Sequence, residues 1–123
     1  PVLGHITTFG GHPVCCAAAL ASLRLLLREP WVAQAEEKGR RLEQVLSRHP
    51  AVREIRRSGL LLAVDLGEPR AAEKMLGLLL EEGAVSDYFL YDPCSFRIAP
   101  PLCISDAEVD EAADIVTRAL DRL

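Results

Sequence analysis

The chain has 123 residues, of which 50% are hydrophobic, and this is enough for one domain with a single core. Its 14 basic and 18 acidic residues are interspersed and give a net charge of -4, so it has no basic patch that would bind nucleic acid. The longest apolar run, 13–27, is interrupted by Ser22 and Arg24 and is shorter than the roughly 20 residues that cross a bilayer, so no membrane segment is expected.

Two helices are expected at the start of the chain. Pro13 suits the first position of a helix over 13–27, because its φ is already helical and its missing N–H is not needed there. That helix is apolar nearly all the way round, so it needs cover from the rest of a larger protein or from a second subunit. Pro30 ends it, and an amphipathic helix follows over 31–49. On the solvent side of this second helix we expect i,i+4 ion pairs, Glu36 with Arg40 and Glu37 with Arg41.

The remainder of the chain alternates strands with helices. Strands are expected over 52–56, 60–66, 84–90 and 95–99, and helices over 69–82 and from Ser105 onward. Gly83 suits a helix C-terminus, and Ser105 with Glu108 forms a capping box. The fold class predicted from this order is α+β, with helices on one face of a mainly antiparallel sheet.

Hydroxyl groups and glycines lead directly into the first helix, in the stretch Ile6-Thr7-Thr8-Phe9-Gly10-Gly11-His12-Pro13. A helix start presents free N–H groups and the positive end of a dipole, and glycine lets the backbone approach a ligand, so an anion site is one interpretation. The other is an ordinary capped helix start, with Thr8 as a cap or turn residue. The residues alone leave both open.

Three segments, in order along the chain, resemble class III aminotransferases, which are pyridoxal-phosphate enzymes. The segment 8–21 reads T-F-G-G-H-P-V-C-C-A-A-A-L-A and is similar to the family's T-F-G-G-N-P-x-x-C-A-A-A-L-A, with His12 in place of asparagine. The others are I-R-R-S-G-L-L-L-A-V-D-L over 55–66, where Arg57 replaces the usual glycine, and F-R-I-A-P-P-L over 96–102. The resemblance covers essentially the whole chain but only about the C-terminal third of a family member.

The resemblance implies the C-terminal small domain of a fold-type I enzyme. Residues 1–28 would form a cofactor-phosphate loop and a buried helix of the large-domain and dimer interface, 29–49 a connecting helix, and 50–123 the small α+β domain. The implied reaction transfers an amino group from an amino acid or omega-amine to a 2-oxo acid. The implied partners are the N-terminal large domain and a second copy of the enzyme. The four cysteines do not form the pattern of a disulfide framework, because Cys15 and Cys16 are neighbours on a helix. This favours a reduced compartment, so we expect a cytoplasmic protein.

The resemblance also assigns binding residues. Thr8 matches the threonine that reaches across the dimer interface to the cofactor phosphate, with Thr7 and Gly10 as further phosphate contacts. Arg97 matches the arginine that binds the substrate carboxylate. By strand alternation its side chain points away from the face that Phe96 and Ile98 share, and unaided it would be interpreted as a solvated strand arginine.

Transamination also needs a lysine that forms a Schiff base with the cofactor and an acid beside the pyridine nitrogen. The chain has only Lys38 and Lys74, both expected on exposed helix faces, and in the family both groups come from further upstream. We therefore assign no catalytic residue here and expect the chain alone to be inactive. The alternative is a small ligand-binding or regulatory and dimerisation module without catalysis, which leaves the motif at Thr8 unexplained.

The remaining polar and sulfur-containing residues receive ordinary interpretations. Asp65 is expected in a strand-end turn rather than in a pocket. The cysteines are expected to be small buried residues, because no C-x-x-C spacing occurs. His12 has no second ligand near it in the sequence, so no metal site is expected.

Overall fold

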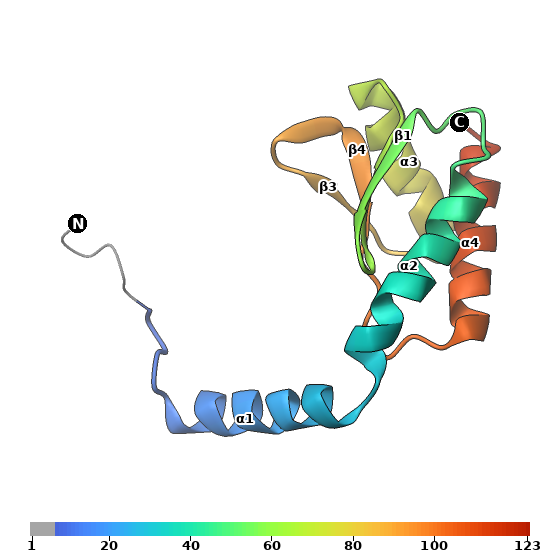
Figure 1. Ribbon diagram of the computed structural model, residues 1–123. Coiled ribbons are helices and arrows are strands. Elements are labelled where there is room, and N and C mark those ends of the chain that lie inside the picture. Colours follow the sequence, from blue (N-terminus) through green and yellow to red (C-terminus); the bar gives the residue numbers. More distant parts are fainter. Residues whose placement is uncertain (1–6) are drawn as a thin grey trace. The chain divides into compact units, whose positions relative to one another are not determined.

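The computed structural model describes residues 7–123, which divide into two compact units, one ending at Val32 and the other running over Ala33–Leu123 (Figure 1). The order of elements agrees with the sequence analysis. The elements are α1 (Pro13–Arg28), α2 (Trp31–Leu46), β1 (Glu54–Ser58), β2 (Leu61–Asp65), α3 (Pro69–Glu81), β3 (Asp87–Phe89), β4 (Asp92–Ile98) and α4 (Asp106–Leu120). No helix in the described range is long and apolar enough to cross a membrane.

Helix α1 begins at Pro13 as expected. The described part of the chain buries none of its residues. Its exposed large side chains are Val14, Leu20, Leu23, Leu25 and Leu27. The prediction that this helix needs cover beyond the chain is consistent with that exposure. Cys103, in the loop before α4, is exposed, and Cys94 is half-buried, so the prediction of buried cysteines is wrong for Cys103. Cys15 and Cys16 lie on α1 and are exposed together with the rest of that helix.

The second unit is a four-stranded antiparallel sheet of order β1-β2-β4-β3, with α2, α3 and α4 packed on one face (Figure 1). Alternate strand residues point to these helices, among them Leu62, Val64 and Phe96, each fully buried. They pack with the apolar stripes of the helices in two adjoining clusters. The α+β class is therefore confirmed, and the opposite face of the sheet is left open within this unit.

Three strands start two or three residues away from the expected position, and β1 runs over Glu54–Ser58 rather than 52–56. Strand β3 begins at Asp87 rather than at Ala84, because the Ala84 N–H bonds to Leu79 O at 2.8 Å and closes the end of α3, where Gly83 has φ +92°. Strand β4 begins at Asp92 rather than at Ser95, because the β3 hairpin already pairs with it there. Neither the hydrogen bond of Ala84 nor the strand pairing at Asp92 is visible in the local sequence.

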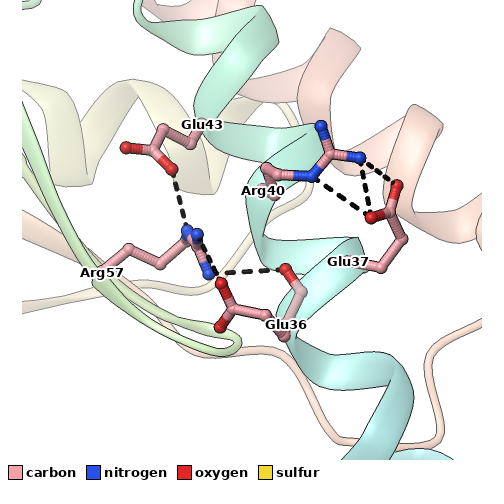
Figure 2. A network of polar contacts seen from close by, with 5 residues as sticks. All are labelled: Glu36, Glu37, Arg40, Glu43 and Arg57. Carbon is pink, nitrogen blue, oxygen red and sulfur yellow. Dashed lines mark hydrogen bonds and ion pairs between the residues drawn. The ribbon is translucent and has the colours of Figure 1, made fainter.

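Helix α2 approaches the β1–β2 hairpin closely at Gly39. A Cβ at this position would lie 1.9 Å from the carbonyl oxygen of Gly59, so a side chain does not fit. Arg57 of β1 spans the same contact, pairing with Glu36 at 2.8 Å and with Glu43 at 2.9 Å (Figure 2). Its hydrogen bonds to Glu36 and Glu43 raise the pKa of the Arg57 guanidinium above its usual value. The arginine that replaces the family's glycine thus lies in the strand and fastens it to α2.

The i,i+4 ion pairs expected on α2 are wrong. Glu36 pairs with Arg57 instead, and Arg40 pairs with Glu37 at 2.6 Å, at a spacing of i,i+3 rather than i,i+4 (Figure 2). Arg41 pairs with Asp110 of α4. Glu36 and Arg41 pair with charged residues of β1 and α4, on which α2 is docked, whereas Arg40 keeps a partner on its own helix.

Candidate functional site

The turn before α1 is built by its glycines. The His12 N–H donates to Phe9 O at 3.1 Å, and Gly11 takes a φ of +75°, a conformation that favours glycine. His12 is the N-cap residue, and the helix start has no side-chain cap. Thr8 lies four residues before the N-cap, so it does not cap the helix, and its side chain is exposed.

Thr7 and Gly10 fit against each other in this turn. A Cβ at residue 10 would come within 1.9 Å of Thr7 Oγ1, so the missing side chain leaves room for that hydroxyl. Thr7, Thr8 and Gly10 are all exposed. The arrangement presents two hydroxyl groups, together with the backbone N–H groups of a glycine turn and of a helix N-terminus. Hydroxyl and N–H groups of this kind can donate hydrogen bonds to a phosphate group.

Arg97 lies on the open face of the sheet. Phe96 is fully buried under the helices, whereas the Arg97 side chain on the other face is 40% exposed, so the expected strand alternation is confirmed. In register across the sheet its neighbours are Ala63 of β2 and Asp87 of β3. Arg97 Nη2 donates to Asp87 Oδ2 at 2.8 Å.

A pocket of about 280 Å³ lies beside the end of β4. Its lining is mostly apolar and comes from the end of β4, the prolines after it, α3 and α4: Leu79, Ala84, Val85, Ser86, Arg97, Ile98, Ala99, Pro100, Pro101, Ala112, Ile115 and Val116. Arg97 and Ser86 are the polar members of this lining. The pocket lies on the helix-covered side of the sheet, whereas the Arg97 guanidinium points to the open face and bonds Asp87 there.

Asp65 takes the turn role predicted for it. Its Oδ1 accepts the Gly67 N–H at 2.6 Å, and its Oδ2 lies 3.8 Å from Arg53 Nε. The side chain is buried and is not among the residues that line the pocket beside the end of β4. No group of three or more potential metal ligands occurs between residues 7 and 123.

The expected exposure of Lys38 is wrong. Lys38 is 8% exposed, and its Nζ donates to Ile104 O, 66 residues further along the chain, in the loop before α4. The loop reaches α2 only in the folded unit, so a helical wheel does not reveal it. Lys74 is exposed as expected, with Nζ bonded to Arg122 O at 2.9 Å and Leu123 O at 2.6 Å. Both ammonium groups have backbone carbonyl partners.

A comparison with known protein families identifies the family of the chain. The family model described as Aminotransferase class-III matches residues 1–120. The chain belongs to this family. Acetylornithine aminotransferase of Gloeobacter violaceus is 41% identical over 97% of the chain and 30% of its own length. A [LysW]-aminoadipate semialdehyde transaminase of Deinococcus radiodurans is 35% identical over the whole chain and 28% of its own length.

Solved structures of transaminases share this fold. An (S)-enantioselective omega-transaminase from Thermomicrobium roseum matches 99% of the chain with a TM-score of 0.81 and 32% identity. The ornithine aminotransferase from Toxoplasma gondii, whose structure shows partial occupancy of PLP at the active site, matches 94% with a TM-score of 0.81 and 32% identity. The chain spans 30% and 28% of the lengths of these two proteins.

Proposed function

We propose that the chain is the C-terminal segment of a pyridoxal-phosphate-dependent aminotransferase that moves an amino group from an amino acid or omega-amine to a 2-oxo acid. Membership of the class III family supports the reaction class. The observation within the structure that supports it most is Arg97, whose side chain is 40% exposed on the open face of the sheet. That position leaves the planar guanidinium accessible to the carboxylate of an amino acid.

The residues before α1 fit the cofactor's phosphate. In this proposal the Thr8 and Thr7 hydroxyls donate to phosphate oxygens, the backbone at Gly10 approaches closely, and the positive end of the α1 dipole favours the negative charge. When bound, the cofactor supplies an electron sink at the carbon that carries the amino group. The chain's own share of the chemistry is to hold the phosphate and the substrate.

Arg97 orients the substrate in this proposal. Two parallel N–H donors of its guanidinium bond the two oxygens of a carboxylate, which fixes both the direction and the distance of the amino acid. An uncharged substrate without a carboxylate gains nothing from this contact. Arg97 is therefore proposed as the residue that distinguishes amino acids from simple amines.

The proposed domain assignment follows from the same residues. In this proposal residues 1–28, of which 1–6 lie outside the described part of the chain, belong to the phosphate loop and to a helix for the large-domain and dimer interface; 29–49 belong to a connecting helix, and 50–123 to the small domain. The exposed apolar surface of α1 supports cover by the N-terminal large domain or by a second subunit of a homodimer. A cytoplasmic location stays a prediction that rests on the cysteines.

Thr8→Val in the full-length enzyme should weaken cofactor binding. Losing a hydrogen bond to a charged group costs about 1.5–3 kcal/mol, which corresponds to roughly a 10- to 150-fold rise in the dissociation constant. Titration of the apoenzyme with pyridoxal phosphate measures it. Thr117→Val is the control, because the Thr117 hydroxyl bonds to Ala113 O within α4. Unchanged affinity in Thr8→Val would show that this hydroxyl does not contact the phosphate.

The 123-residue chain on its own should not catalyse transamination. Both of its lysines already donate to backbone carbonyls, and Lys38 is buried. Incubation with pyridoxal phosphate followed by borohydride reduction and peptide mapping should therefore give no stoichiometric label. Specific labelling of Lys38 or Lys74 together with turnover would contradict the assignment of the catalytic lysine to another part of the enzyme.

A further inference from the structure

Two consecutive residues at the start of β3 hold Arg97. The Ser86 hydroxyl donates to the backbone oxygen of Arg97, and Asp87 Oδ2 accepts from Arg97 Nη2 at 2.8 Å. The other oxygen of the same carboxylate, Asp87 Oδ1, accepts the Tyr88 N–H at 2.9 Å. The backbone of Arg97 and its guanidinium are thus both tied to β3, and the Asp87 carboxylate is itself held at both oxygens.

Asp87 faces Arg97 directly in the β3–β4 register. On the other side of Arg97 the register places Ala63, whose methyl group cannot hydrogen-bond. Among residues 7–123, Asp87 is the side chain bonded to the Arg97 guanidinium, and the bond uses Nη2 alone. A guanidinium has five N–H donors, so enough remain for a second carboxylate.

We propose that Asp87 is a positioning residue, which holds the Arg97 guanidinium over the open face of the sheet in an orientation that receives a substrate carboxylate. The inference rests on the proposed function of Arg97. A long, flexible side chain loses rotamer freedom when it binds, and an arginine that is already oriented loses less, so binding is tighter. The pair is about half exposed, and ion pairs of this kind contribute little free energy, so Asp87 does not withhold Arg97 from the substrate.

Asp87→Ala in the full-length enzyme tests the inference. Without the acceptor, Arg97 samples more rotamers, and the KM for the amino-acid substrate should rise about two- to fivefold while kcat stays nearly unchanged. For a simple amine without a carboxylate, both constants should stay within about twofold of the parent enzyme. Asp87→Asn keeps one acceptor oxygen, so its KM should lie between those of Asp87→Ala and the parent enzyme.

The matched control is Asp110→Ala. The Arg41–Asp110 pair joins α2 to α4, and its side chains are 42% and 56% exposed, against 40% and 55% for Arg97 and Asp87. Removing it deletes an equivalent ion pair away from the open face, so the KM for either substrate should not change. Thermal unfolding of both variants reports whether either change damages the fold.

Each outcome decides between defined roles. A lower KM for the amino acid in Asp87→Ala would mean that Asp87 competes with the substrate carboxylate for Arg97. An unchanged KM would mean that Asp87 does not contribute to substrate binding. Equal losses of kcat/KM for the amine and the amino acid would mean that Asp87 has a structural role. Each of these three results would overturn the inference.

In an Arg97→Lys background the effect of Asp87→Ala on the KM should disappear. If Arg97→Lys alone leaves the discrimination unchanged, the proposed function fails, whereas an effect of Arg97→Lys without one of Asp87→Ala refutes only this inference.

Discussion

Replacing Arg97 by lysine in the full-length enzyme should lower kcat/KM for amino acids by about ten- to a hundredfold, through the loss of roughly 1.4–2.8 kcal/mol of carboxylate recognition. Lysine keeps the positive charge, but its single ammonium group cannot reproduce two parallel N–H bonds from a planar fork. The absorption spectrum of the bound cofactor should stay unchanged, because the substitution lies on the substrate side. Steady-state kinetics with an amino acid and with a simple amine measure the effect.

The amine is the internal control, because it has no carboxylate and should keep its kcat/KM. Arg40→Lys is the control variant, since Arg40 on α2 is 48% exposed and pairs only with Glu37 among the described side chains. That change should leave both substrates unaffected. Equal losses for amines and amino acids in Arg97→Lys, or no loss at all, would show that Arg97 is structural.

Gly39→Ala should destabilise the α+β unit by about 1–3 kcal/mol, the usual cost of overpacking a filled contact. The new methyl group would meet the Gly59 carbonyl oxygen at 1.9 Å, and a backbone atom cannot rotate away. Helix propensity alone predicts the opposite sign, because alanine is better than glycine inside a helix by about 1 kcal/mol. Urea unfolding followed by circular dichroism distinguishes the two signs.

Gly77→Ala is the matched control for this prediction. Gly77 also lies inside a helix, α3, but a Cβ built there meets no atom within 4 Å. The same substitution should therefore stabilise by about 0.5–1 kcal/mol through propensity alone. If Gly39→Ala raises the unfolding midpoint as Gly77→Ala does, the contact between α2 and the β1–β2 hairpin is not too tight for a methyl group.

Local signals in the sequence were sufficient for much of the architecture. Pro13 and Pro69 mark the starts of two helices, the Ser105–Glu108 capping box begins the last one, and Gly83 ends α3 with a positive φ. Each of these is a rule about a residue and its immediate neighbours, so no knowledge of the fold is needed. Period-two alternation likewise placed Arg97 on the opposite face from Phe96.

Partners that meet only after folding could not be found in this way. Asp87 faces Arg97 because β3 is three residues long and pairs with β4 in one particular register, and neither property is visible in the sequence. Lys38 is buried because a loop 66 residues away brings the Ile104 carbonyl to it. Sequence periodicity identifies which face of an element is apolar, but the partner that covers a face or neutralises a charge is chosen by contacts between distant segments. The face of the sheet on which Arg97 lies was therefore predictable from the sequence, whereas the residue proposed to orient its guanidinium was decided by strand register.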